Sequence, residues 1–206
     1  MNRLFDENNM NIHEGHLGGY IKSSNQPSVS GLNIKNGDPM TWHPDLWLWA
    51  MSALNIKSVL DIGCGEGHCA AFFKKFGCDV TGVDGSRLAY QDSKIPNEHV
   101  QHDFCTGSFK PNKRYDMVWC SEFVEHVEER YADNFLETFK YANNFILMTF
   151  AQPDQLGWHH VNCQSQAYWE DKLCSIGYMI EPQLTRISRE ISTGHFAHSG
   201  LVFCKQ

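Results

Sequence analysis

The residues with the clearest chemical potential form a glycine-rich turn directly after an apolar run. The segment 59–68 reads VLDIGCGEGH, with glycines at positions 63, 65 and 67. Glycine lets a backbone turn sharply and approach a ligand that a Cβ would hold away. A tight strand-to-helix turn without any ligand would use the same residues. The turn therefore gains functional meaning only from the residues around it.

Two aspartates stand where a ligand on this turn would need them. Asp84 follows Gly63 by 21 residues, at the end of a second apolar run, where a carboxylate could accept both hydroxyls of a ribose. Asp103 comes just past a third such run and could accept the exocyclic amine of a purine, with Phe104 beside it as a stacking face. Together the three sites predict that a nucleoside binds across successive strand ends.

The glycine spacing distinguishes a dinucleotide, which carries a pyrophosphate, from a nucleoside ligand without one. Dinucleotide-binding folds carry G-x-G-x-x-G, because a helix N-terminus must meet a pyrophosphate. Here the spacing is G-x-G-x-G, and His68 stands where the third glycine of that fingerprint would fall. The incomplete fingerprint argues against a nicotinamide-dependent oxidoreductase.

A second group, Glu122, Glu125 and His126, could act on an acceptor. We expect a helix over Phe123 to Tyr141, which would place these side chains on one face turned toward the cleft. Three such ligands could bind a divalent cation that orients and acidifies a hydroxyl. Glutamates at a helix start also interact favourably with the helix dipole and need no other purpose.

The loop after the fifth expected strand contains Trp158, His159, His160, Val161 and Asn162. It offers an aromatic wall, a base and an amide, which would suit a hydroxylated ring such as a sugar. Adjacent histidines point in different directions, so we expect only one of the two to face the cleft. The candidate catalytic residues are His126, His159, His160 and Glu122. Farther along the chain, His195 and His198 could close the same pocket, but a solvated turn is the simpler interpretation.

Alternating apolar and amphipathic segments must position these residues. Pro44 opens an expected helix over 44–54. Strand and helix taking turns indicate an α/β fold with a mostly parallel sheet and right-handed crossovers. The expected strands are SVLDIG, DVTGVD, HVQHDF, YDMVWCS, NFILMTF, YMIEP and LVFCK. We expect one domain over 41–206. Residues 1–40 form an arm, interpreted either as a partly disordered terminus or as a lid that Tyr20, Ile21 and Leu32 could anchor.

Composition limits the alternatives. The 206 residues, 42% hydrophobic and 20% charged, fit an ordinary globular domain. No stretch approaches the ~20 apolar residues of a membrane span, and the eight cysteines form no C-x-x-C pair, so we expect a cytoplasmic protein without membrane partners. The net charge of −7 argues against a nucleic-acid partner.

Four motifs together resemble the class I S-adenosylmethionine-dependent methyltransferases. They are DIGCGEG at 61–67, VDGS at 83–86, HDF at 102–104 and WCSEFVEHV at 119–127, and the resemblance covers about 42–150. It implies a Rossmann-like three-layer sandwich whose seven-stranded sheet ends in an antiparallel strand. It further implies that Gly63 to Gly67 lie under the methionine moiety, with Asp61 holding its amine. The cofactor-binding residues expected in this way are Asp61, Gly63, Cys64, Gly65, Gly67, Asp84, Gly85, Asp103, Phe104 and Ser121.

The resemblance implies methyl transfer with S-adenosylhomocysteine as product, and the acceptor-side residues favour a hydroxyl of a small molecule or glycan. Certain metal-dependent O-methyltransferases, including ubiquinone-pathway enzymes and small-RNA 3′-end methyltransferases, use a motif of the form found at Glu122, Glu125 and His126, which makes Mg²⁺ a candidate cofactor. Two alternatives stay open: a metal-assisted methyltransferase of RNA 3′ termini, and a non-catalytic module that binds S-adenosylmethionine. The sequence leaves the acceptor and the oligomeric state undetermined.

Overall fold

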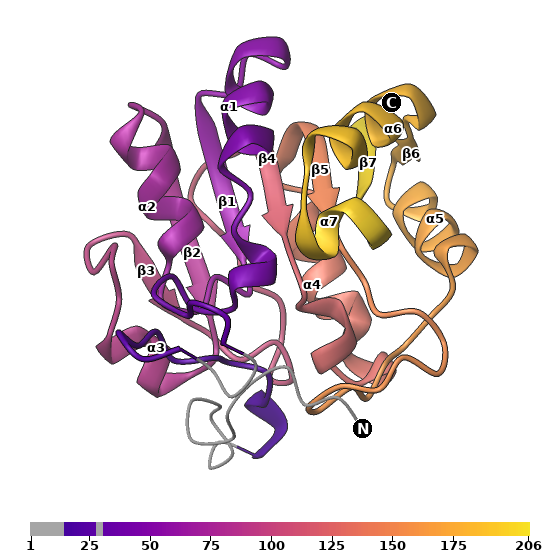
Figure 1. Cartoon of the computed structure of the whole chain (residues 1–206). Helices are drawn as coiled ribbons and strands as arrows, with labels where there is room; N and C mark the ends of the chain where they lie inside the picture. The colour runs from indigo at the N-terminus through magenta and orange to yellow at the C-terminus, as the bar shows by residue number, and fades with distance from the viewer. Residues whose placement is uncertain (1–14, 28–30) are drawn as a thin grey trace.

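The computed structural model describes residues 15–27 and 31–206 and has a seven-stranded sheet at its centre (Figure 1). The strands lie in the order β3-β2-β1-β4-β5-β7-β6. Their bounds are β1 (Ser58–Ile62), β2 (Asp79–Asp84), β3 (His99–Gln101), β4 (Tyr115–Cys120), β5 (Ala142–Met148), β6 (Tyr178–Ile180) and β7 (Leu201–Lys205).

The first five strands are parallel and the last two pairings are antiparallel. β1 pairs with β2 on one side and with β4 on the other, with Val59 opposite Val80 and Met117. Nearly continuous apolar runs suit these strands because helices cover both faces of such a sheet. β7 runs antiparallel between β5 and β6. The expected fold class, a Rossmann-like sheet with its last strand antiparallel, is confirmed.

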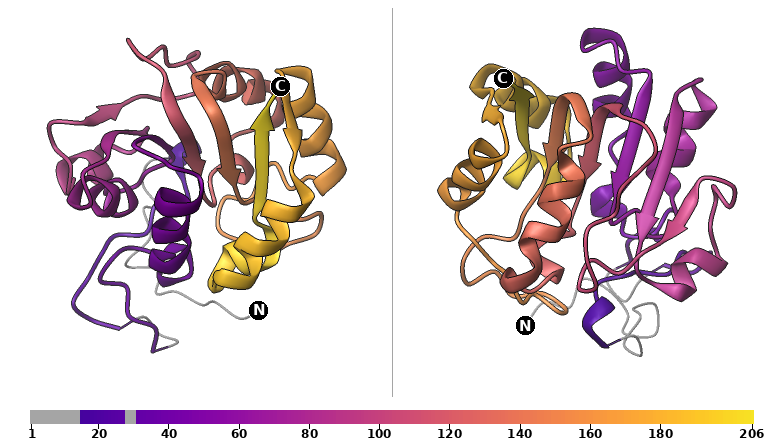
Figure 2. Two further views of the ribbon diagram at one scale, coloured as in Figure 1. Left: turned by 90° about the horizontal axis from the view of Figure 1, so that it is seen from above. Right: turned by 180° about the vertical axis from the view of Figure 1, so that it is seen from behind.

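Helices cover both faces of the sheet, as the views from above and behind show (Figure 2). One core cluster joins α1, α2 and α7 to one face through Trp47, Phe73 and Phe196. The other joins α4 and α5 to the opposite face through Phe135 and Trp169. The helix bounds are α1 (Pro44–Ala53), α2 (His68–Lys75), α3 (Arg87–Gln91), α4 (Ala132–Phe139), α5 (Gln166–Ser175), α6 (Pro182–Ile191) and α7 (Gly194–Ser199).

The helix expected over Phe123 to Tyr141 is only partly correct. Its first part consists of two 3-10 turns, η4 (Val124–His126) and η5 (Glu129–Tyr131), and α4 begins after them. Val127 between the turns is extended, with φ −106° and ψ 121°, which interrupts the helix. Glu122, Glu125 and His126 therefore do not share one face of an α-helix. The turn expected around His195 is also wrong, since this residue lies in α7.

The carboxyl ends of the parallel strands meet at one edge of the sheet, the lower edge in Figure 1. The described part of the arm and the loop after β5 gather at this same edge (Figure 1). In open α/β sheets, ligands bind outside the carboxyl ends of the strands. No helix among the described residues is long and apolar enough to span a membrane.

Candidate functional site

A cavity of about 520 Å³ lies at the carboxyl edge of the sheet. This volume is within the range of small-molecule sites. Its walls come from the turn after β1, the end of β2, the segment after β4, the loop after β5, the arm and α7. The residues that line it include Asp61, Gly63, Cys64, Gly65, Asp84, Gly85, Ser121, Glu122, His126, His160, Asp38 and His195.

The glycine turn forms one wall of the cavity, and its backbone requires glycine. Gly63, Gly65 and Gly67 have φ values of +72°, +52° and +79°, in the region that L side chains rarely adopt. A Cβ on Gly63 would lie 2.5 Å from the ring of Phe123, whereas a Cβ on Gly65 would meet nothing closer than Tyr20 at 3.9 Å. Gly63 thus allows close packing behind the turn, and Gly65 leaves space on the cavity side.

Asp84 joins the end of β2 to this turn. Its Oδ2 accepts a hydrogen bond from the Gly65 N–H at 2.8 Å, and its Oδ1 accepts one from the Ser86 N–H at 2.8 Å. These bonds hold the carboxylate on the cavity wall, where Gly85 lies beside it. The residue expected at the ribose is therefore placed next to the glycine turn.

Asp61 lies beneath the turn and is 2% exposed. Burial raises the pKa of its carboxyl group to about 7, against the effect of the hydrogen bond from the Ala70 N–H. Asp61 lines the cavity, so a cationic group bound next to its carboxyl group would restore its charge. An ammonium group is one ligand of this kind.

The two residues expected at the adenine, Asp103 and Phe104, make contacts outside the lining of the cavity. Asp103 accepts a hydrogen bond from the Cys105 N–H through Oδ1, and its Oδ2 lies 2.7 Å from His16 Nε2. Phe104 is 3% exposed and packs edge-on against Phe123 in the core. Neither Asp103 nor Phe104 is among the residues that line the cavity.

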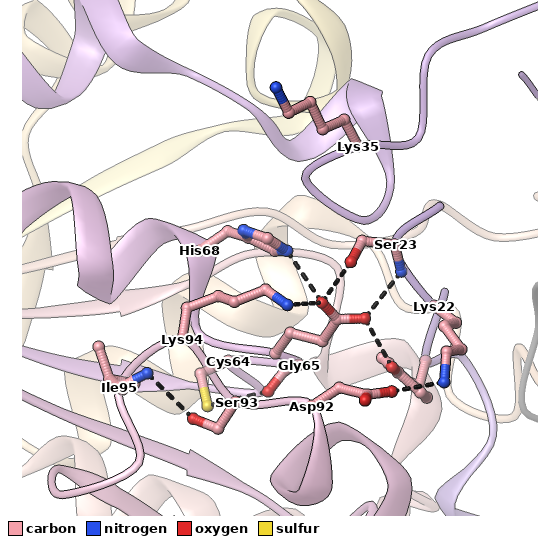
Figure 3. A network of polar contacts seen from close by, with 12 residues as sticks. Lys22, Ser23, Lys35, Cys64, Gly65, His68, Asp92, Ser93, Lys94 and Ile95 are labelled. Atoms are coloured by element: carbon pink, nitrogen blue, oxygen red, sulfur yellow. Dashed lines mark hydrogen bonds and ion pairs between the residues drawn. The ribbon is translucent and has the colours of Figure 1, made fainter. Parts of the chain in front are cut away.

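Glu66, inside the glycine turn, is the main attachment point of the arm. Its buried carboxylate lies 2.8 Å from the Tyr20 hydroxyl, 2.7 Å from the Ser23 N–H, and 3.1 Å from both His68 Nε2 and Lys94 Nζ. Figure 3 shows Ser23, His68 and Lys94 converging on this one group. Burial alone would raise the pKa of Glu66, but the hydrogen bonds from His68, Ser23 and Tyr20 hold it well below its usual range.

Other arm residues follow the wall of the cavity. Leu17 lies against Gly85, where a Cβ would come within 2.5 Å of its side chain. Gly19, with φ +103°, lies so close to the His126 ring that a Cβ would come within 2.7 Å of it. The described arm therefore contacts the cavity wall both at Gly85 and at His126. Sequence reasoning expected Tyr20 as an anchor but missed Glu66 as its partner.

On the acceptor side, Glu125, His126 and His160 each offer a ligand atom, and these atoms lie within 4.8 Å of one another. Glu125 is 0% exposed, and neither carboxylate oxygen has a hydrogen-bond partner among the described residues. Burial, and then the charge of Glu122, raise its pKa well above the usual value. Burial also lowers the pKa of His126 to about 3, so its imidazole stays neutral.

The loop after β5 is fastened to the 3-10 turn η4, and this fixes His160. The backbone N–H groups of Val161 and Asn162 donate to the Glu125 carbonyl at 2.9 and 3.1 Å, and Asn162 Nδ2 donates to the Val124 carbonyl. Of the histidine pair, His160 lines the cavity, whereas His159 packs against Gly18 and offers its carbonyl to His126 Nδ1. Of the pair His159 and His160, only His160 lines the cavity, as expected from the sequence.

Glu122 lies near this cluster but turns toward His195, with Oε2 3.4 Å from His195 Nδ1. The ligand group expected from the sequence was Glu122, Glu125 and His126, whereas the group whose ligand atoms all lie within 4.8 Å of one another contains Glu125, His126 and His160. Ser121 lines the cavity as expected, with Oγ 3.4 Å from the Thr149 hydroxyl. Asp38 and His16 were not expected at the site, and no sequence pattern marks them.

Comparison with known proteins gives a family match over most of the chain. A model of the family described as "Methyltransferase domain" matches residues 31–188. A ubiquinone biosynthesis O-methyltransferase of Photorhabdus laumondii is 36% identical over 80 residues, which are 35% of this chain and 33% of the relative. The protein of the same name from Salmonella arizonae is 38% identical over 80 residues, with the same two shares. The chain thus spans about a third of the length of the curated relatives it matches.

Solved structures share the fold at low identity. The magnesium protoporphyrin IX methyltransferase of Synechocystis PCC 6803 with bound S-adenosylhomocysteine has a TM-score of 0.58 and 16% identity, covering 78% of this chain and 80% of that one. The methyltransferase domain of bacterial CtHen1-C has a TM-score of 0.58 and 18% identity, covering 79% and 97%. At these identities the likeness concerns the fold.

Proposed function

This chain belongs to the methyltransferase domain family, and from this membership we propose that it transfers the methyl group of S-adenosylmethionine to a hydroxyl oxygen of a small-molecule or glycan acceptor. One observation carries the proposal: a single cavity has the glycine turn and Asp84 in one wall and His126, His160 and Glu122 in another. A donor bound on the first wall would have acid–base residues facing its reactive end.

The donor site fits the residues present. The cavity volume of about 520 Å³ and the space beside Gly65 accommodate a nucleoside with an amino-acid tail. In this proposal Asp84 binds the ribose hydroxyls, and Asp61 binds the ammonium group of the methionine moiety. Gly63, Cys64, Gly65, Gly85 and Ser121 supply the surrounding wall. The donor supplies an already activated methyl group, so the protein's task is alignment and removal of the acceptor proton.

We propose further that Glu125, His126 and His160 hold a divalent cation. The supporting observation is the buried Glu125 carboxylate, which has no partner among the described residues. Such a group is costly unless it is paired or coordinates a metal. Two imidazoles in the set favour Mn²⁺, Fe²⁺, Co²⁺ or Zn²⁺ over Mg²⁺, which prefers oxygen ligands. A cation there would bind the acceptor oxygen and make its hydroxyl more acidic.

We propose that the described part of the arm, residues 15–27 and 31–40, acts as a lid over the domain at 41–206, whereas residues 1–14 and 28–30 of the expected arm lie outside the described residues. Its support is the buried bond between Tyr20 and Glu66 together with the contacts of Leu17 and Gly19 on the cavity wall. The lid would exclude water from the site once the donor is bound. The cytoplasmic location expected from composition stays a prediction.

Relatives named ubiquinone biosynthesis O-methyltransferase support oxygen as the acceptor atom. The second candidate is a hydroxyl at an RNA 3′ terminus, which the Glu125, His126 and His160 cluster favours. The net charge of −7 argues against it. A non-catalytic binding module would bind the donor and show no turnover.

Calorimetric titration with S-adenosylhomocysteine is the first test. We expect micromolar binding that Asp84→Ala weakens by about 10- to 100-fold, because a hydrogen bond to a charged group contributes about 1.5–3 kcal/mol. Asp79→Ala, at the opposite end of the same strand, is the control and should bind as the wild type does. Tritiated S-adenosylmethionine with catechol, methyl glucoside and a short RNA then identifies the acceptor class. Absence of binding by the wild type would overturn the donor site.

A further inference from the structure

Three side chains of different chemistry, His16, Asp103 and Cys105, meet just past the end of β3. A ring nitrogen, a carboxylate oxygen and a thiol sulfur from these residues all lie within 4.8 Å of one another. His16 belongs to the arm, and its Nε2 lies 2.7 Å from Oδ2 of Asp103, which is 87 positions away in the sequence. The cluster therefore joins the arm to the sheet.

The turn after β3 holds two of these side chains side by side. The backbone N–H and the hydroxyl of Thr106 donate to the Asp103 carbonyl at 3.0 and 2.6 Å, which closes the turn. Between the two ligands, Phe104 is buried in the core and its carbonyl accepts Asn134 Nδ2 at 2.6 Å. The Cys105 N–H binds Asp103 Oδ1 at 2.8 Å, which leaves Oδ2 toward the arm. The backbone thus places both side chains without the help of an ion.

The arm supplies the third side chain from a short turn of its own. His16 lies in the 3-10 turn η2 (Gly15–Leu17). The next residue, Leu17, packs against Gly85 so closely that a Cβ there would lie 2.5 Å from the Leu17 side chain. The side chains of His16 and Asp103 are 51% and 23% exposed, and Cys105 is half-buried. An ion from solvent can therefore reach the cluster.

The donor set fits zinc. Zn²⁺ binds histidine nitrogen, carboxylate oxygen and cysteine sulfur, with bonds of about 2.0–2.3 Å, so the ligand atoms of one tetrahedral site lie about 3–4 Å apart. The spread of up to 4.8 Å in this cluster needs only small side-chain movements to match. Mg²⁺ and Ca²⁺ prefer oxygen ligands alone. The thiol also distinguishes this cluster from the group of Glu125, His126 and His160, which contains no sulfur.

We propose that His16, Asp103 and Cys105 bind Zn²⁺, with water as the fourth ligand, and that the ion fastens the arm to the end of β3. On binding, the Cys105 thiol releases its proton to solvent and the sulfur ligates as a thiolate, without any change of oxidation state. The ion uses Asp103 Oδ2, the oxygen that faces the arm, so it competes with the adenine amine of the donor for this carboxylate. This consequence rests on the proposed donor site, whereas the zinc site itself does not.

Titration of the full chain with Co²⁺ tests the site, because Co²⁺ accepts the same ligands as Zn²⁺ and a cobalt–thiolate bond absorbs in the near ultraviolet. The test variants are Cys105→Ser and His16→Ala. Cys174→Ser changes an exposed cysteine on α5. Cys163→Ser changes a cysteine in the loop after β5, the loop that also contains His160. Neither control residue belongs to a candidate cation group in the described part of the chain.

We expect the wild type to develop the thiolate absorption as Co²⁺ is added and to lose it when Zn²⁺ displaces the cobalt. Cys105→Ser should show no such absorption, and His16→Ala should bind Co²⁺ at least about tenfold more weakly, since even outer-shell partners of metal ligands contribute that much. Both controls should match the wild type. A wild type without the absorption would overturn the site, and so would a Cys105→Ser variant that keeps it.

Calorimetry with S-adenosylhomocysteine, with and without Zn²⁺, tests the competition. At a Zn²⁺ concentration about tenfold above its own Kd, the apparent Kd of the nucleoside should rise by about tenfold in the wild type. Cys105→Ser keeps Asp103 and should show no such rise. A wild-type Kd that is independent of Zn²⁺ would overturn the competition. A wild type that does not bind S-adenosylhomocysteine at all would overturn the donor site, while the cobalt absorption would still decide the zinc site.

Discussion

His16 Nε2 lies 2.7 Å from Asp103 Oδ2, so a residue of the arm holds the carboxylate at the end of β3. From the sequence, this carboxylate was expected to accept a hydrogen bond from the adenine amine of the donor. The His16 side chain is 51% exposed, and an exposed pair of this kind contributes little stability. A donor whose adenine amine bound Asp103 would therefore compete with the arm for one acceptor group.

Removing this competitor should improve donor binding. For His16→Ala we expect the Kd of S-adenosylhomocysteine to fall by about two- to fivefold, since exposed ion pairs contribute at most about 1 kcal/mol. Calorimetry measures the change, with His198→Ala as the control for loss of an exposed histidine. Weaker binding by His16→Ala would instead make His16 part of the donor site.

Glu66→Gln should release the arm. Breaking a buried charge pair typically costs about 3–5 kcal/mol, because the partner groups lose their counterpart. We expect a lower melting temperature, faster hydrogen exchange over residues 15–27 and weaker binding of S-adenosylhomocysteine. Glu98→Gln removes a more exposed carboxylate paired with Lys74 and should change none of these. Unaltered exchange over the arm would contradict the assignment of Glu66 as its anchor.

Glu125→Gln should remove cation binding without unfolding the protein. Because the wild-type carboxyl group is buried without a partner, a neutral amide of the same shape should keep the free energy of unfolding within about 1 kcal/mol. Titration with Mn²⁺ should show an affinity loss of at least about tenfold, since even outer-shell partners of metal ligands contribute that much. Glu128→Gln, which changes a surface carboxylate paired with Arg130, is the control. Equal Mn²⁺ affinity in the wild type and Glu125→Gln would reject the cation site.

His43 should make the fold sensitive to mild acid. It is 2% exposed, and burial lowers its pKa to about 4. An unfolded histidine titrates near 6.5, so below this pH the unfolded chain binds more protons than the folded one. The contribution of neutral His43 to the free energy of unfolding is then fully present above about pH 6.5 and is lost as the pH falls toward 4. At pH 5 the loss amounts to about 2 kcal/mol.

Urea unfolding of the wild type and His43→Leu at pH 7 and pH 5 measures this contribution. The loss of stability between the two pH values should be smaller in the variant by about 2 kcal/mol. His198→Leu, at an exposed histidine, should lose as much as the wild type. An identical pH dependence in all three proteins would show that His43 is not the acid-sensitive group.

The strands and the glycine turn could be predicted because their signals are local. The apolar runs that end at Ile62 and Asp84 are visible in short windows of sequence, and positive φ at Gly63 and Gly65 follows from the residue type. The family resemblance rested on these same segments. Nothing beyond neighbouring residues is needed to recognise them.

The acceptor side depends on contacts between distant segments. Glu122 lies outside an α-helix because Thr149, on the neighbouring chain segment after β5, binds its N–H. Asp38 and His195 meet although 157 positions separate them. The choice of His160 over His159 follows from the bonds of Val161 and Asn162 to Glu125. Helical spacing alone therefore grouped Glu122 with Glu125 and His126.

The position of β7 has a consequence for how the chain folds during synthesis. β6 pairs only with β7 in the described sheet, and β7 also completes the pairing of β5. Residues 178–180 leave the ribosome well before residues 201–205, so β6 has no strand to join until the later segment emerges. The pairing of β5, β7 and β6, next to the loop of His160, therefore forms last. Until then, a nascent chain would expose the apolar edge of β5.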